Sequence, residues 1–179
     1  FIRLHIWKYG YGKFFLTDIR KKGSGNAGAT NAFRVMGFKF AVGVFAIDII
    51  KGFVSAQYIS SIFFQASINE MILCGIGAVL GHVYPVFYSF KGGKGAATLV
   101  GALIAFYPWL IPIALLVWIF TIVLTGYVGL ATVLAGISLP IIAFIGQLEG
   151  LMLYILLSLI IIFTHRSNIY RMINKNENR

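Results

Sequence analysis

Six long apolar segments take up most of this chain and leave few charged residues to cover a surface in water. The sequence is 59% hydrophobic and 11% charged, whereas a soluble domain carries about 25% charged residues. Runs of this kind along the whole chain exceed what a cleaved signal peptide explains. They are continuous rather than alternating, so we expect helices and not a membrane barrel. The sequence therefore predicts an all-α integral membrane protein.

The segments differ in length. At ~1.5 Å per residue, residues 96–107 would reach under ~20 Å, less than a hydrocarbon core of ~30 Å, so we expect this helix to be short or not fully spanning. Residues 1–16 mix cations with aromatic residues and suggest an interfacial segment or the end of a helix whose start is missing. The expected fold is one membrane-embedded domain, residues 1–179, with about six hydrophobic helices, or about seven with that incomplete first helix. The six segments are residues 38–64, 71–90, 96–107, 109–125, 128–145 and 151–164.

Fifteen Lys and Arg residues against five Asp and Glu give a net charge of +10. In a soluble protein this would suggest a nucleic-acid partner. Here the cations flank apolar segments, where they set topology and attract anionic lipid or substrate, so we expect no nucleic acid. Cations concentrate in residues 20–39, 91–94 and 166–179, and residues 65–70 and 146–150 have none. The positive-inside rule predicts a multi-pass protein with these cationic segments on the cytoplasmic side.

The first glycine-rich loop (residues 23–31) has the composition of a phosphate site. Glycine tolerates positive φ and allows the backbone to approach a ligand closely. A helix beginning near Ala29 would direct its N-terminus at the same anion, with Arg34 one turn past Thr30. The alternative is a flexible polar linker, but a linker of this kind would not need Arg34 one turn past Thr30. The candidate residues are Ser24, Gly25, Asn26, Gly28, Thr30, Asn31 and Arg34.

The second glycine-rich loop (residues 91–95) combines lysine with glycines that expose backbone N–H groups. It is similar to a shortened phosphate loop but lacks the Gly-x-x-x-x-Gly-Lys-Ser/Thr spacing, so we do not predict nucleotide hydrolysis. Lys94 is the expected cation on a phosphate. The alternative is an ordinary cationic loop of a membrane protein, although two such loops on one face argue against coincidence. The candidate residues are Lys91, Gly92, Gly93, Lys94 and Gly95.

Other polar residues lie in or after the apolar segments. If the last helix continues, His165 and Asn168 are i, i+3 neighbours on one face. His165 is then a base, a hydrogen-bond donor or an interfacial anchor. His82 lies deeper, where a structural role is the usual one, and it remains a candidate binding residue. Asp48 and Lys51 are also i, i+3 neighbours, which favours a structural pair over a transport site.

The sequence lacks the residues that several common kinds of site require. Cys74 is the only cysteine and the three histidines are far apart, so we expect no disulfide and no metal site. The acyltransferase dyad His-x-x-x-x-Asp does not occur, because the positions five beyond the histidines are Gly10, Phe87 and Tyr170. With five acidic residues in all, no carboxylate pair is available for acid–base work.

Together these motifs resemble the bacterial acylphosphate:glycerol-3-phosphate acyltransferase family (PlsY-type). The resemblance runs from Asp18 to the C-terminal tail and is specific in combination rather than in any single loop. Residues 48–52 also fit a family pattern. The three signatures correspond to Asp18-Ile19-Arg20 with the first loop and Arg34, to Gly81-His82 through Pro85 with the second loop and Thr98, and to His165-Arg166 with Asn168-Ile169.

The resemblance implies transfer of a fatty acyl group from acyl phosphate to the 1-hydroxyl of glycerol-3-phosphate. The products would be lysophosphatidic acid and inorganic phosphate, in phospholipid synthesis at the bacterial cytoplasmic membrane. No cofactor is implied, and membrane lipid is the expected surroundings; nothing in the sequence predicts an oligomeric state. Acyl phosphate is already activated, so such an enzyme needs mainly positioning and charge stabilisation.

The resemblance also implies roles for individual residues. Arg34 and Lys94 would clamp phosphate, and Ser24 and Thr30 would donate hydrogen bonds. His165 and Asn168 would orient glycerol-3-phosphate. The base for its hydroxyl is either His165 or a phosphate oxygen of a bound substrate. Where the family usually has a serine contact, after Val128, this chain has Gly129.

A second function remains open from the residues alone. A small membrane transporter or a lipid- or phosphate-binding membrane protein would use the same loops to bind anions. It would depend on Asp48 and Lys51 as a buried ion relay. The absence of Lys and Arg on the predicted outer side argues against anionic cargo.

Overall fold

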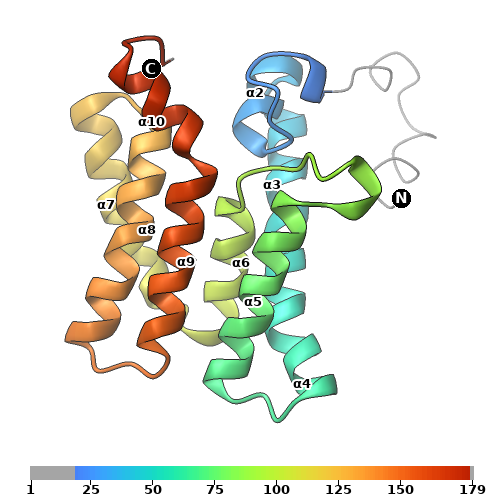
Figure 1. Cartoon of the computed structure of the whole chain (residues 1–179), viewed down its shortest axis with the longest axis vertical. Coiled ribbons are helices and arrows are strands. Elements are labelled where there is room, and N and C mark those ends of the chain that lie inside the picture. The colour runs from blue at the N-terminus through green and yellow to red at the C-terminus, as the bar shows by residue number, and fades with distance from the viewer. Residues whose placement is uncertain (1–18, 178–179) are drawn as a thin grey trace.

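The computed structural model describes residues 19–177, so the expectations for residues 1–16 and for Asp18 lie outside the described part. Within residues 19–177 the regular structure is helical throughout and includes no strand (Figure 1). This confirms the all-α fold that continuous apolar runs predict.

Each of the six expected apolar segments is helical in the described part of the chain. The first runs through α3 (Phe38–Val54), a π-helical turn η2 (Ser55–Ile59) and α4 (Ser60–Phe63). Next come α5 (Ile68–Val83) and the short α6 (Ala96–Phe106). At ~1.5 Å per residue the 11 residues of α6 are too short to cross a bilayer, as expected. The last three are α7 (Leu110–Thr125), α8 (Val128–Ile145) and α9 (Leu151–Thr164).

The second apolar segment ends earlier than its hydrophobicity predicts. Helix α5 stops at Val83, and residues up to 90 contain only the 3₁₀ turn η3 (Val86–Tyr88). Pro85 is the physical reason, because proline disfavours helical geometry in the preceding residue and has no N–H to donate. The chain thus leaves the helix early and forms the second glycine-rich loop.

By length and composition, two described helical stretches suffice to cross a bilayer: Ile68–Tyr88, which joins α5 and η3, and Val128–Ile145, which is α8. A third results if α9 and α10 (Arg166–Ile173) count as one span, which bends by 52°. The outward side chains of α7 are apolar, with Phe120 and Leu124 each 66% exposed. An apolar surface of this extent is unfavourable in water and suits contact with lipid.

The helices pack in two groups of three, α3 with α5 and α6, and α7 with α8 and α9, joined where α5 meets α9 (Figure 1). Small residues bring α3 and α6 unusually close. A Cβ at Gly52 would collide with the carbonyl of Thr98, and one at Gly101 would collide with the carbonyl of Ile49. Close approach at small residues is a typical way for helices to associate in membranes.

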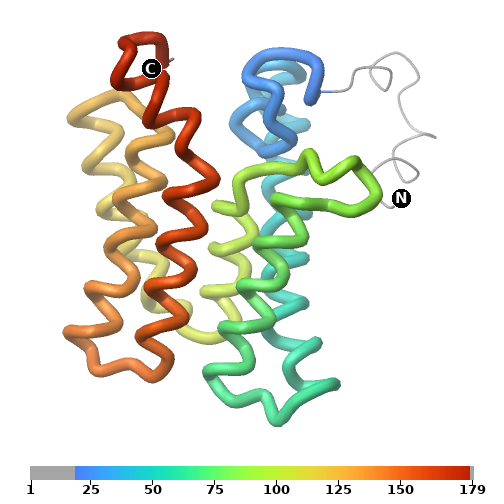
Figure 2. The backbone as a smooth tube through the Cα atoms, in the orientation of Figure 1, coloured from blue at the N-terminus to red at the C-terminus, as the bar shows by residue number. Residues whose placement is uncertain are grey.

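Three polar segments gather at one end of this bundle. They are the first glycine-rich loop with α2 (Ala29–Met36), the second glycine-rich loop, and α10 (Figures 1 and 2). Because α5 and α9 both end there and α6 begins there, residues far apart in sequence come together. The site described next lies at this end.

Candidate active site

The first glycine-rich loop is shaped by one buried amide. Asn31 is 1% exposed, and its Nδ2 donates to the carbonyls of Ile19 (2.8 Å), Lys22 (3.1 Å) and Asn26 (2.9 Å). Its Oδ1 accepts from the backbone N–H of Ser24 at 2.9 Å. A buried amide with all of its groups paired fixes the path of the loop. Asn31 therefore fixes the shape of the loop and also lines the site.

Helix α2 begins at Ala29, as predicted, and carries Thr30 and Arg34 toward the same space. Arg34 is exposed, and its guanidinium makes no hydrogen bond or ion pair with another residue of the described range 19–177. Arg34 lies in the last turn of α2 and lines the cavity described below, and a cation without a partner at such a place is suited to an anion.

The second glycine-rich loop is tied to the helices on both sides. The N–H groups of Gly92 and Gly93 donate to the carbonyls of Val83 (3.1 Å) and His82 (3.2 Å). The Thr164 hydroxyl donates to the carbonyl of Lys94 at 2.9 Å. The expectation that the loop glycines expose their N–H groups to a phosphate is therefore wrong for these two, which hold the loop on the end of α5.

The start of α6 offers backbone N–H groups at the site that the loop glycines do not. Gly95 caps this helix, and Ala96 and Ala97 in its first turn line the cavity described below. The first N–H groups of a helix have no partner within it and form a natural site for anions.

His165 lies at the break between α9 and α10 and is 5% exposed. Its Nδ1 is 2.9 Å from the carbonyl of Ile161, which only accepts, so Nδ1 carries the hydrogen and Nε2 carries a lone pair. Burial, followed by the charge of Lys94, lowers the pKa of His165 to about 4. The imidazole is therefore neutral at neutral pH.

A chain of hydrogen bonds links Lys94 to the C-terminal tail. The Lys94 ammonium donates to Oδ1 of Asn168, and Nδ2 of Asn168 donates to Glu177 at 2.7 Å. Arg171 Nε donates to the other oxygen of Glu177 at 2.5 Å. Burial acts to raise the pKa of Glu177, but the hydrogen bonds from Arg171 and Asn168 leave it below its usual value.

Lys94 is itself perturbed by these surroundings. Burial, and then the positive charges of Arg171 and Arg34, outweigh Glu177 and lower the pKa of Lys94 to about 8. The lysine is therefore still mostly a cation at neutral pH, in a place that is short of negative charge. An anionic ligand would relieve this repulsion.

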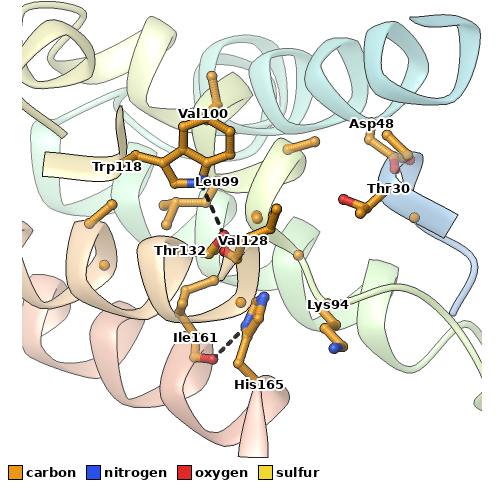
Figure 3. A pocket seen from close by; sticks show the side chains of 18 of the residues that line it. Thr30, Asp48, Lys94, Leu99, Val100, Trp118, Val128, Thr132, Ile161 and His165 are labelled. Carbon is orange, nitrogen blue, oxygen red and sulfur yellow. Dashed lines mark hydrogen bonds between the residues drawn. The ribbon is translucent and has the colours of Figure 1, made fainter. Parts of the chain in front are cut away.

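The polar residues surround one end of a cavity of about 620 Å³ (Figure 3). The other end is an apolar slot between α6, α7 and α8, where Val100, Trp118 and Leu139 form part of the wall. Within it the Trp118 indole N–H donates to Thr132 Oγ1 at 3.2 Å. All five predicted catalytic residues and several of the predicted binding residues line this cavity: Ser24, Asn26, Gly28, Thr30, Asn31, Arg34, His82, Lys94, Gly95, His165 and Asn168.

A smaller cavity of about 290 Å³ adjoins the first one, and Ser24, Asn26 and Lys94 line both. It collects the remaining predicted binding residues, which are Gly25, Lys91, Gly92 and Gly93. Every residue that the sequence singles out as a site candidate therefore lies at this end of the bundle.

Two further residues line the site that the sequence reasoning missed. Arg171 follows His165 and Asn168 at steps of three, so helical spacing contained a signal for it. Glu177 lies in the tail beyond α10, where no helical periodicity could have indicated its position.

Gly129, where the resemblance implies a serine contact, faces Asn168. A Cβ on Gly129 would lie 2.7 Å from the Asn168 side chain. Asn168 thus fills the space that a side chain would need.

Comparison with known proteins agrees with this geometry. Residues 7–175 match the family described as glycerol-3-phosphate acyltransferase. The chain is 42% identical to glycerol-3-phosphate acyltransferase 2 of Bacillus anthracis, over 93% of this chain and 86% of that protein. It is 40% identical to the glycerol-3-phosphate acyltransferase of Aquifex aeolicus, over 90% and 85%. The chain belongs to the glycerol-3-phosphate acyltransferase family.

Two crystal structures of PlsY, described as an integral membrane glycerol 3-phosphate acyltransferase, have the same fold. The glycerol 3-phosphate form superposes with a TM-score of 0.84 at 39% identity, covering 91% of this chain and 82% of that chain. The lysophosphatidic acid form gives 0.80 at 40% identity, covering 88% and 81%. This member of the glycerol-3-phosphate acyltransferase family is therefore an integral membrane protein and an enzyme.

Proposed function

We propose that this acyltransferase moves a fatty acyl group from acyl phosphate to the 1-hydroxyl of glycerol-3-phosphate. The observation that carries the proposal is the two-part cavity, cationic at one end and apolar along the other. A product with a phosphate and an acyl chain matches both parts at once. Solved relatives in glycerol 3-phosphate and lysophosphatidic acid forms support these ligands.

The phosphate of glycerol-3-phosphate would bind at the cationic end. Arg34 and Lys94 supply positive charge, and Ser24 and Thr30 supply hydroxyl donors. The N-termini of α2 and α6 add the positive ends of two helix dipoles. Phosphate contacts of this kind are charge-assisted and therefore strong.

In the proposed reaction the substrate hydroxyl oxygen forms an ester bond to the acyl carbon, and the bond from that carbon to the donor's phosphate oxygen breaks. The hydroxyl proton needs an acceptor. His165, with a pKa of about 4, accepts a proton only weakly, whereas a phosphate monoester takes its second proton near pH ~6. We therefore assign the proton to a substrate phosphate oxygen. The lone pair of His165 Nε2 is then left to accept a hydrogen bond from another hydroxyl of the substrate and so to orient glycerol-3-phosphate.

The direct test incubates the purified protein with acyl phosphate and glycerol-3-phosphate. Lysophosphatidic acid and inorganic phosphate should form in equal amounts. Binding of glycerol-3-phosphate without product, accompanied by flux across vesicles, would favour a transporter instead.

The pKa of Lys94 predicts how activity depends on pH. A cation must be present to bind the phosphate, and the lowered pKa means that it is lost above about pH 8. We expect kcat/KM, which reports on the free enzyme, to fall about tenfold for each pH unit above that point. Lys94→Arg should remove this decline, since arginine stays charged. If kcat/KM of the unchanged protein and of Lys94→Arg falls equally at high pH, the decline does not come from Lys94.

The apolar slot predicts a limit on acyl-chain length. Ala135 on α8 lines the slot, so Ala135→Phe should fill its deeper part. Each methylene kept out of the slot forfeits about 0.8 kcal/mol, so kcat/KM for palmitoyl phosphate should fall roughly tenfold or more while octanoyl phosphate is little affected. Leu134→Phe is the matched control, because Leu134 is exposed and does not line the cavity. Equal losses for both donors would place the acyl chain elsewhere.

We also propose that the polar end of the bundle lies on the cytoplasmic side of the bacterial cytoplasmic membrane, in one domain that spans the whole chain. The cations of both loops and of the C-terminal segment support this orientation. Lys175 is exposed, so thiol labelling of a Lys175→Cys variant in intact and in opened cells would test this orientation.

A further inference from the structure

Three ionisable side chains meet beneath the second glycine-rich loop, where α3 packs against α5. The Lys51 ammonium is 3.0 Å from Oδ1 of Asp48 and donates a hydrogen bond to Nδ1 of His82. His82 Nδ1 is 3.5 Å from the same Asp48 oxygen. The Asp48 and His82 side chains are only 2% and 4% exposed. We refer to Asp48, Lys51 and His82 as the buried cluster.

The cluster is more than the ion pair that spacing predicts. A buried carboxylate is costly unless it is paired, and Lys51 supplies that pairing. Because the same ammonium also donates to Nδ1, the remaining hydrogen of a neutral His82 ring is on Nε2. The orientation of the ring is therefore fixed by Lys51, which is fixed in turn by Asp48.

His82 connects the cluster to the loop. Its carbonyl accepts the N–H of Gly93 at 3.2 Å. Its ring also fills the space where a Gly93 side chain would be, since a Cβ there would collide with the imidazole. Lys94 is the next residue, so the imidazole lies directly beneath the point from which the Lys94 side chain extends.

We propose that Asp48, Lys51 and His82 are positioning residues that hold the second glycine-rich loop and, through it, set the Lys94 ammonium for phosphate binding. The proposal rests on the proposed function, in which Lys94 binds the phosphate. It differs from a purely structural role in one respect: loss of the cluster should cost phosphate affinity only when Lys94 is present.

The test is a double-mutant cycle on binding of glycerol-3-phosphate, measured by calorimetry in detergent without any acyl donor. His82→Ala should weaken binding about tenfold, because residues that share a network are coupled. In a Lys94→Gln background, which keeps a side-chain donor and measurable binding at millimolar ligand, the same change should weaken binding less than about twofold. Thr121→Ala, a buried change on α7 away from the cavity, is the control and should leave affinity unchanged.

Equal weakening by His82→Ala in both backgrounds, or no weakening in a folded protein, would overturn the proposal. If His82→Ala does not fold, Lys51→Met gives the same cycle without opening space beneath Gly93. Lys51→Arg should then restore part of the lost affinity. A wild-type protein that binds glycerol-3-phosphate but forms no lysophosphatidic acid would refute the proposed function and leave the cycle interpretable. If it binds no glycerol-3-phosphate, the cycle is run with inorganic phosphate.

Discussion

Lys94→Ala is expected to lower kcat/KM for acyl transfer by about 10²–10³-fold, the usual loss when one donor to a charged reacting group is removed. Lys94 lines both cavities and hydrogen bonds to Asn168, so it lies where the proposed phosphate site and the smaller cavity meet. The loss should appear in production of lysophosphatidic acid. Folding should be nearly normal, because burying this cation is unfavourable in the free protein.

The matched control is Lys39→Ala, which removes an exposed lysine at the start of α3 that lines neither cavity. It should retain full activity. Activity of Lys94→Ala within about tenfold of the unchanged protein, in a preparation that unfolds at the usual temperature, would refute the assignment of Lys94 to the site.

Arg34→Ala should reduce kcat/KM by about 100-fold, because a hydrogen bond to a charged group contributes ~1.5–3 kcal/mol. Arg34 makes no ion pair with another described residue, so its removal should cost no stability. The effect should fall mainly on the KM for glycerol-3-phosphate. Arg34→Lys should be intermediate, since lysine keeps the charge but loses the planar fork of donors. A kcat defect with an unchanged KM would instead indicate that Arg34 acts on the leaving phosphate.

The helices could be predicted closely because a bilayer demands long apolar runs and separates them with polar turns. Segments 128–145 and 151–164 match α8 and α9 at both ends. The error lies at the end of α5, where apolar residues continue past Val83 and the constraint from Pro85 decides the conformation. Hydrophobicity measures how well a residue tolerates lipid, and it says nothing of backbone geometry.

Most of the residues that gather at the candidate site could be predicted from the sequence. The hydrogen bonds between them could not. Charge placed both loops and the His165 segment on one face, and they do line adjoining cavities. The structure was needed to show that Asn31 organises the first loop and that Gly92 pairs with Val83. The apolar slot was not predictable either, because its volume depends on how α6, α7 and α8 pack.

The continuous passage from a cationic end to an apolar slot has a consequence for how the proposed reaction runs forward. Its two products partition into different phases. Inorganic phosphate dissolves in water, while lysophosphatidic acid partitions into the bilayer, so each is diluted away in a phase that the other does not enter. Separation by partitioning would disfavour reversal by mass action, with no gate needed in the protein.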